Sequence, residues 1–145
     1  MKFFVAYLCI FAGGSVGALS RFGIQEACRK WTPLPGWGAI FIANMLGCLA
    51  IGFTVAWLQG LQAEFHLDPI SPLRRYIETQ ETRQGIALLA VGFCGAFTTF
   101  STFSLDNHFL YRSHRGQMSF NMVAQVVVGL AAVSAGWYAG QWVAA

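Results

Sequence analysis

One uncharged stretch decides the fold: residues 84–105 read QGIALLAVGFCGAFTTFSTFSL. Its 22 residues are enough to cross the hydrocarbon core of a bilayer, which takes about 20 residues of helix. Three more uncharged stretches, of 18 to 33 residues, lie at 3–20, 31–63 and 116–145. The sequence therefore predicts an all-α membrane protein in which each stretch supplies one transmembrane helix.

The composition of the whole chain agrees with this interpretation. Hydrophobic residues make up 56% of the 145 positions and charged residues only 10%, whereas a soluble domain is about 25% charged. The length suits a single domain, 1–145, without a separate soluble catalytic domain. The net charge of +3 does not indicate a nucleic-acid partner. We expect transmembrane helices over 3–24, 37–59, 85–105 and 118–142, with a polar loop over 60–83.

The third expected helix contains a weak point. Gly92, Gly95 and the β-branched pair Thr98-Thr99 are poor helix formers at positions expected in mid-membrane. We therefore expect a helix break near 95–99. A break frees carbonyl groups, which can hold a cation, and amide N–H groups, which favour an anion. The alternative is an unbroken helix whose hydroxyl groups bond to its own carbonyls while its phenylalanines face lipid.

Three further features can serve either a pathway or ordinary packing. Phe97, Phe100 and Phe103 are three apart and are expected to share one helix face, where positively polarised ring edges can line an anion path. Asn44 lies near the middle of the second helix, where an unbonded amide costs about 2–7 kcal/mol. It must therefore face an interface or a pathway. Arg21, at the end of the first helix, either reaches the lipid headgroups or forms an anion-attracting vestibule.

The first and fourth helices carry small residues at a spacing of four. Gly13 and Gly17 recur on one face of the first helix, and Gly136 and Gly140 on one face of the fourth. Such faces let helix backbones approach closely in lipid, so we expect both helices to pack tightly against a neighbour. The polar residues of the fourth helix have no assigned role; they are Asn121, Gln125, Ser134 and Tyr138.

None of the acids and histidines falls inside an expected span, so neither a proton relay nor metal-catalysed chemistry is indicated. This weighs against an enzyme. It also weighs against a small dual-topology multidrug or cation exporter, which needs a membrane-embedded carboxylate. A structural subunit of a larger membrane complex fits the small-residue faces but gives no purpose to the Thr/Ser/Phe pattern.

The basic residues give no clear orientation in the membrane. One side of a four-span arrangement carries four bases and the other carries five, whereas the positive-inside rule needs an imbalance. Either another signal resolves the orientation, or the chain inserts both ways and pairs as an antiparallel dimer. The first side has Lys2, Arg74, Arg75 and Arg83, and the second has Arg21, Arg29, Lys30, Arg112 and Arg115.

Three motifs of this sequence resemble the CrcB/Fluc fluoride channels of bacteria. They are GGSVGALSRF at 13–22, NMLG at 44–47 and GFCGAFTTFSTFS at 92–104. Their order and spacing and the four-span length agree, so the resemblance covers essentially the whole chain. It implies a multi-pass, fluoride-specific channel of the bacterial inner membrane that passively exports cytoplasmic fluoride. It also implies an antiparallel, dual-topology homodimer with two pores, surrounded by membrane lipid.

The resemblance implies roles for individual residues as well. Phe100 and Phe103 would line the pore, Asn44 would be the pore asparagine of the second helix, and Arg21 would lie in the vestibule.

The remaining implied roles concern a cation and a track of hydroxyl groups. Gly95 and Thr98 would supply backbone carbonyls to a structural Na⁺ at the dimer axis, which is not transported. Ser101 and Thr102 would belong to the hydroxyl track of the pore. The fourth helix lacks a clear serine where the polar track of the family would continue, so no pore residue is assigned there.

Overall fold

The computed structural model describes residues 2–31, 34–65 and 84–144, so most of the expected polar loop, 66–83, lies outside the described residues. The described part is helical, as the sequence predicts, and holds four helices long and apolar enough to cross a membrane. These candidate spans are Phe4–Trp31, Gly38–Gly60, Ile86–Ser113 and Arg115–Ala144.

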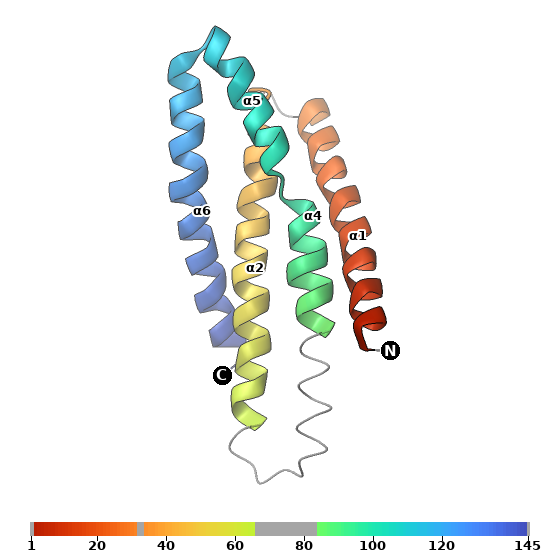
Figure 1. Cartoon of the computed structure of the whole chain (residues 1–145). Coiled ribbons are helices and arrows are strands. Elements are labelled where there is room, and N and C mark those ends of the chain that lie inside the picture. The colour runs from red at the N-terminus through yellow and green to blue at the C-terminus, as the bar shows by residue number, and fades with distance from the viewer. Residues whose placement is uncertain (1, 32–33, 66–83, 145) are drawn as a thin grey trace.

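The long helices run side by side and alternate in direction (Figure 1), so the two ends of the chain lie at the same end of the bundle. The third span is built from three helical pieces, the first of which is a π-helix, η1. The elements are α1 Lys2–Trp31, α2 Gly38–Phe65, η1 Ile86–Cys94, α4 Gly95–Phe97, α5 Phe100–Ser113 and α6 Arg115–Ala144.

Glycines set the contact between α1 and η1. A Cβ atom at Gly13 would overlap the carbonyl oxygen of Leu88, and one at Gly17 would overlap that of Phe93. On the opposite helix, a Cβ at Gly92 would stand 2.7 Å from the carbonyl oxygen of Ile10. The two backbones are therefore in direct contact, which confirms the close packing predicted from the small-residue face of the first helix.

Glycines also allow close backbone contact between α2 and α6. A Cβ at Gly136 would overlap the carbonyl oxygen of Leu49, and a Cβ at Gly140 would meet that of Phe53 at 2.5 Å. Both glycines are buried. Their burial confirms the prediction for the fourth helix and leaves the bundle as two tight pairs, α1 with η1 and α2 with α6.

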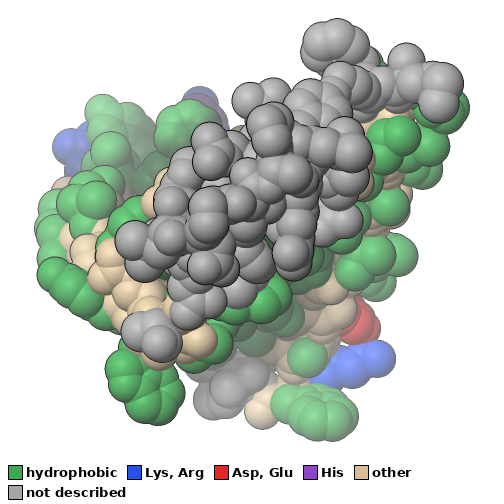
Figure 2. Space-filling view, turned by 90° about the horizontal axis from the view of Figure 1, so that it is seen from below, with side chains coloured by type: hydrophobic (Ala, Val, Ile, Leu, Met, Phe, Trp, Pro, Cys, Tyr) green, Lys and Arg blue, Asp and Glu red, His purple; other side chains and the backbone are tan. Residues whose placement is uncertain are grey.

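The outer faces of the helices are apolar. Large side chains such as Phe11, Leu130 and Trp142 are 74%, 66% and 84% exposed. Viewed from the end in Figure 2, hydrophobic side chains dominate the described surface and few charged ones are visible. In water this much exposed apolar surface would drive aggregation, whereas lipid covers it without cost. The protein is thus a multi-pass membrane protein.

Three helices run well past the ends of the expected spans. α1 continues to Trp31 and includes Glu26, α2 continues to Phe65 and covers the start of the expected 60–83 loop, and α5 continues to Ser113 and includes Asp106. The expectation that acids stay outside the spans therefore does not hold for the helices as the structure has them. Charge marks where an apolar stretch ends, but a helix can continue past it because Glu26 is paired on its own helix, with Arg29 at 2.7 Å and Lys30 at 3.1 Å.

Candidate functional site

The helix of the third span is interrupted at two residues. Thr98 has φ −82° and ψ 158°, and Thr99 has φ −150° and ψ 122°. Both are extended conformations, which suit β-branched residues. Gly95, by contrast, keeps helical angles of −64° and −35°. In Figure 1 the thin connection between α4 and α5 lies near the mid-height of α6, far from either end of the bundle.

The side chain of Asn44, on α2, forms hydrogen bonds with the backbone at the interruption. Its Oδ1 accepts a hydrogen bond from the N–H of Thr99 at 3.0 Å, and its Nδ2 donates to the carbonyl oxygen of Thr99 at 3.4 Å. Three residues further along α2, Gly47 leaves room for the threonine before it, because a Cβ there would overlap Cγ2 of Thr98. The motif at 44–47 thus supplies both an amide and a space for the interruption.

This arrangement releases the carbonyl groups of residues 95–98 from the helix, because each would accept from the N–H four residues later and no such bond joins α4 to α5 among the described residues. In a continuous helix the N–H of Thr99 would bond the carbonyl of Gly95, and that of Thr102 would bond the carbonyl of Thr98. The first N–H donates instead to Asn44, at 3.0 Å, and the second donates to Oγ1 of Thr99, at 3.3 Å. Gly95 and Thr98, the two residues expected to offer carbonyls to a cation, are among the four residues that lose their helical donors.

Arg21 reaches the same interruption from α1. Its Nη1 donates to the carbonyl oxygen of Thr98 at 3.3 Å, and the residue is half-buried. Arg21 lies ten residues before the end of α1, rather than at the helix end as the expected boundary implies. Its guanidinium therefore contacts the third span, which neither expectation for this residue had included.

The hydroxyl groups that the family resemblance assigns to a track, those of Ser101 and Thr102, both lie close to the hydroxyl group of Thr99. Its Oγ1 lies 3.1 Å from Oγ of Ser101 and 3.3 Å from Oγ1 of Thr102. Thr99 is buried, Thr102 is half-buried and Ser101 is exposed, so the three hydroxyls lead from the interior of the chain to its outer face. Thr99 also serves as the N-cap of α5.

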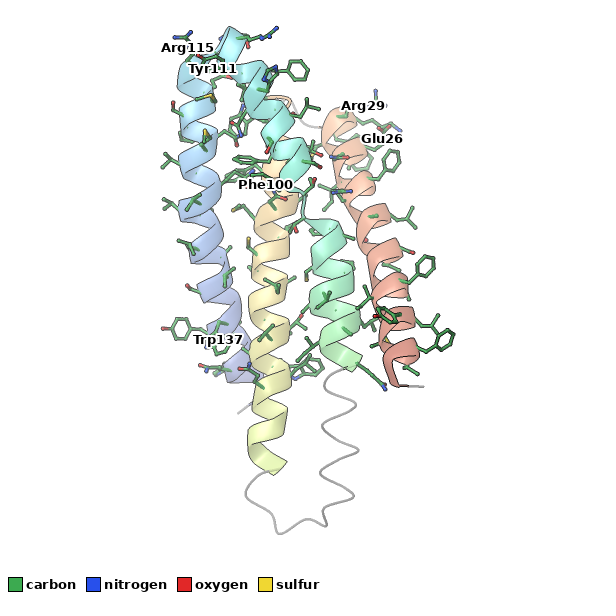
Figure 3. All side chains as sticks on the ribbon, in the orientation of Figure 1. Glu26, Arg29, Phe100, Tyr111, Arg115 and Trp137 are labelled. Carbon is green, nitrogen blue, oxygen red and sulfur yellow. The ribbon has the colours of Figure 1, made fainter. Side chains whose placement is uncertain are left out.

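The three phenylalanines do not share one face, so that expectation is wrong. Phe97 is buried at 5% exposure and stacks on Phe93 with the ring centres 5.4 Å apart. Phe100, after the interruption, is 79% exposed, and its ring centre lies 5.7 Å from that of Phe103. A spacing of three gives a common face only in a continuous helix, and the extended Thr98 ends that periodicity. Figure 3 shows Phe100 at the first turn of α5, beside the middle of the bundle.

Two residues of α6 that have no role predicted from the sequence belong to the site. Oε1 of Gln125 accepts from Nδ2 of Asn44 at 3.3 Å, and Asn121 is buried at 1% exposure. Ser134, the deepest polar residue of that expected span, is exposed and bonds the carbonyl of Leu130, one turn back. The four-residue spacing of Asn121 and Gln125 is the signal that these amides share one face of α6, from which Asn121 bonds Asn107 on α5 and Gln125 bonds Asn44 on α2.

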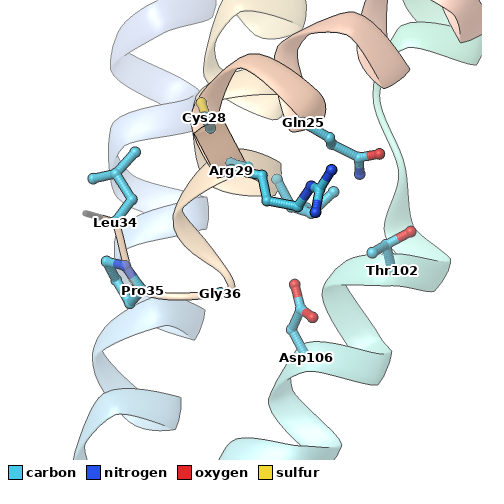
Figure 4. A pocket seen from close by; sticks show the side chains of 10 residues that line it. Gln25, Cys28, Arg29, Leu34, Pro35, Gly36, Thr102 and Asp106 are labelled. Atoms are coloured by element: carbon cyan, nitrogen blue, oxygen red, sulfur yellow. The ribbon is translucent and has the colours of Figure 1, made fainter. Parts of the chain in front are cut away.

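A pocket of about 400 Å³ lies near the end of α1, between that helix, the start of α2 and the side of α5 (Figure 4). Its lining includes Thr102, one member of the hydroxyl cluster, together with Gln25, Arg29 and Asp106. The pocket therefore gives Thr102 access to one end of the bundle. It is lined by charged side chains of both signs, and Arg21 is not among its lining residues.

The comparisons with known proteins agree over nearly the whole chain. The family model described as "CrcB-like protein, Camphor Resistance (CrcB)" matches residues 8–137. A protein of Dehalococcoides mccartyi named "Fluoride-specific ion channel FluC" is 32% identical over 134 residues, which are 92% of this chain and 90% of that protein. Proteins of the same name from Bacteroides fragilis and Nitrobacter winogradskyi are 33% identical over 138 residues and 36% over 133. These alignments cover 91% and 89% of this chain, and 93% and 90% of the two relatives.

Proposed function

This chain belongs to the CrcB-like family, and on that premise we propose that it is a fluoride-specific ion channel. The observation that carries the proposal is the similarity, over about nine-tenths of the chain, to relatives named fluoride-specific ion channels. The chain is a channel rather than an enzyme. Passive flow of fluoride out of the cell lowers its cytoplasmic concentration and its toxicity.

The proposed pathway runs along the start of α5. Fluoride is small and strongly hydrated, so a pore must replace its water with donors close at hand. Phe100 and Phe103 offer ring edges with partial positive charge, and their 5.7 Å separation supports a shared role. Ser101 and Thr102 offer hydroxyl groups beside them. The pocket that reaches Thr102 is the proposed end of the pathway.

Asn44 has a double role in this proposal. Its amide stabilises the interruption through Thr99 and lies at the pathway that begins one residue later, at Phe100. Arg21 is proposed to raise the electrostatic potential for anions beside the interruption, supported by its bond to the carbonyl of Thr98. Because this guanidinium is half-buried, it is screened by salt less than a surface charge is.

The proposed assembly is an antiparallel homodimer with dual topology. The near-equal count of basic residues on the two sides supports it. So does the 79% exposure of Phe100, because an aromatic ring that lines a pore must meet something other than lipid. The proposed location is the bacterial inner membrane, where such a channel separates cytoplasmic fluoride from the outside.

We assign the carbonyls of Gly95 and Thr98 to a structural Na⁺, which is not transported. Carbonyl oxygens suit hard cations of this kind, and the loss of both helical donors supports the assignment. Two carbonyls are few for a sodium ion, and a second copy of the chain related by a two-fold axis would double the set. A bound cation at this depth favours anions nearby.

The alternatives are not favoured. A multidrug or cation exporter was set aside for lack of a carboxylate in the spans, and that reason is weaker because α5 includes Asp106. Family membership now decides against it. A structural subunit would leave the bonded interruption at Thr98 and Thr99 without a purpose.

The proposal is tested by fluoride efflux from liposomes that contain this protein alone. We expect fluoride to leave without a proton gradient and chloride to be retained. Equal chloride efflux, or a strict need for a pH gradient, would contradict a passive fluoride channel.

A further inference from the structure

We infer that Asn107 and Asn121 are positioning residues that hold Phe103 in place through a chain of two hydrogen bonds. Nδ2 of Asn121, on α6, donates to Oδ1 of Asn107 at 3.2 Å. Nδ2 of Asn107, on α5, donates to the carbonyl oxygen of Phe103 at 2.9 Å. The backbone of Phe103 is thereby tied to α6. This inference rests on the proposed function, in which Phe103 lines the pathway.

Both asparagines are buried, so neither side chain is simply solvated at the surface. Asn107 is the buried residue of α5, at 8% exposure, while its neighbours on the helix are exposed or half-buried. Asn121 is 1% exposed and is the largest fully buried side chain of the described residues. An amide in such surroundings costs free energy unless it is bonded. The bond between the two asparagines satisfies Nδ2 of Asn121, whose Oδ1 has no partner among the described residues.

The position of α5 depends on few attachments. Its first residues are held by the bonds of Asn44 to Thr99, and its middle is held by the pair Asn107–Asn121. Phe100 and Phe103 lie between these two attachments. The first attachment fixes where α5 begins, and the second fixes its tilt and rotation against α6. With the second removed, the exposed ring of Phe100 and its neighbour can turn away from the pathway.

The bond from Asn107 to Phe103 has a local consequence too. Side chains that bond the carbonyl one turn back often bend a helix at that carbonyl. Ser113 and Ser134 make bonds of the same kind, to Phe109 and Leu130, but their side chains are exposed and bond no side-chain amide of the residues that the structure describes. Asn107 differs because its acceptor oxygen is bound to a second helix.

The experiment compares fluoride efflux and thermal stability in three variants: Asn121→Leu, the double variant Asn107→Leu/Asn121→Leu, and Ser134→Ala. The single leucine leaves Asn107 without its donor, so we expect lower stability and fluoride efflux reduced about five- to tenfold, the factor that one net buried hydrogen bond supplies. Ser134→Ala removes an exposed bond of the same type on α6 and should change neither property.

The double variant separates positioning from packing. Replacing both partners of a buried hydrogen bond with apolar groups can be nearly neutral for stability, so we expect its melting temperature to return close to that of the wild type. Efflux should stay low, because the tie from Phe103 to α6 is still missing. Recovery of efflux together with stability would overturn the inference, and so would wild-type efflux in Asn121→Leu.

The same data distinguish failure of the inference from failure of the proposed function. If the wild-type protein releases no fluoride, the proposed function fails and the role of the two asparagines fails with it. If the wild type releases fluoride and the variants do so equally well, only the inference fails. Should Asn121→Leu not fold, the double variant decides alone, since it leaves no amide of this pair unbonded.

Discussion

The carboxamide of Asn44 bonds both backbone groups of Thr99, accepting from its N–H at 3.0 Å and donating to its carbonyl at 3.4 Å. This pairing replaces the hydrogen bonds that a helix would give to a residue in mid-span. Thr99 is 8% exposed, so water does not satisfy these groups. One side chain on α2 therefore satisfies the backbone groups of a non-helical residue inside the third span. Irregular backbone is tolerated at membrane depth only where protein or water satisfies it in this way.

Replacing Asn44 with leucine should destabilise the protein and reduce fluoride efflux. The variant keeps the approximate volume but leaves the N–H and carbonyl of Thr99 unbonded, and we expect a loss of about 1–2 kcal/mol in the free energy of unfolding. Unfolding of the purified protein in mixed detergent measures this. Met45→Leu, at the next position of α2, is the matched control and should stay within about 0.5 kcal/mol of the wild type. Equal stability of both variants would mean that Thr99 does not depend on Asn44.

Gly17→Ala should weaken the contact of α1 with η1, whereas Gly23→Ala on the same helix should not. A Cβ at Gly17 would overlap the carbonyl oxygen of Phe93, while one at Gly23 meets nothing within 4 Å. We expect a loss of about 1–3 kcal/mol for the first, as for overpacked cores. For the second we expect no loss, or a gain of up to about 1 kcal/mol from higher helix propensity. Thermal unfolding of the two variants side by side is the measurement, and a tolerated Gly17→Ala would show that the two backbones can separate freely.

The sequence predicts the spans well because their length and lack of charge are local properties. It also predicts that Asn44 must be bonded, since an amide in hydrocarbon needs a partner. It does not predict that the partner is Thr99, 55 positions away, because that pairing depends on how α2 and the third span pack.

The predictions that the structure corrects fail for the same reason, which is that they depend on how the helices pack. Phe97 and Phe100 were placed on one face by a periodicity that holds only where the helix is continuous. Gln125 and Asn121 looked like scattered polar residues, because only the packing of α6 against α2 and α5 brings them to Asn44 and Asn107.

Phe100→Ile and Phe103→Ile should each strongly reduce fluoride efflux while the protein stays folded. Isoleucine keeps most of the hydrophobicity but lacks the ring edge. Phe100 is 79% exposed in the protomer, so its replacement removes little packing within one chain. Phe109→Ile is the matched control, because Phe109 is also exposed, at 61%, and lies further along α5. Normal efflux in both test variants would mean that the two rings only pack, and the pathway would have to lie elsewhere.

The chain should insert into the membrane in both orientations. Reporters that are active on opposite sides, fused to the carboxyl terminus, should both give signal because the basic residues number four against five. Adding two or three arginines between α2 and η1, within residues 66–83, should force one orientation, since short connections between spans carry this signal. A wild-type chain that reports from one side alone would contradict the antiparallel homodimer.

The positively charged Arg21 and the proposed Na⁺ both approach the carbonyl oxygen of Thr98. The carbonyl oxygen of Thr98 accepts a hydrogen bond from the guanidinium at 3.3 Å and is also assigned to the cation. Two unit charges 4 Å apart repel by about 4 kcal/mol at the effective dielectric constant of a protein near its surface. Arg21→Gln removes the positive charge and keeps a donor for the carbonyl, so it should strengthen Na⁺ binding.

The measurement is the melting temperature of the purified protein as Na⁺ replaces a large organic cation at constant ionic strength. Na⁺ should raise the melting temperature of the wild type, because a ligand that binds only the folded state stabilises it by mass action. In Arg21→Gln the Na⁺ concentration at the midpoint of this rise should be at least about tenfold lower than in the wild type. A tenfold change corresponds to about 1.4 kcal/mol, which is part of the repulsion of about 4 kcal/mol that the substitution removes. Arg29→Gln is the control, because that guanidinium pairs with Glu26 at 2.7 Å, and it should leave the midpoint unchanged. No effect of Na⁺ on any of the three proteins would argue against a cation at Gly95 and Thr98. A midpoint unchanged by Arg21→Gln alone would mean that the guanidinium leaves Thr98 when the cation binds.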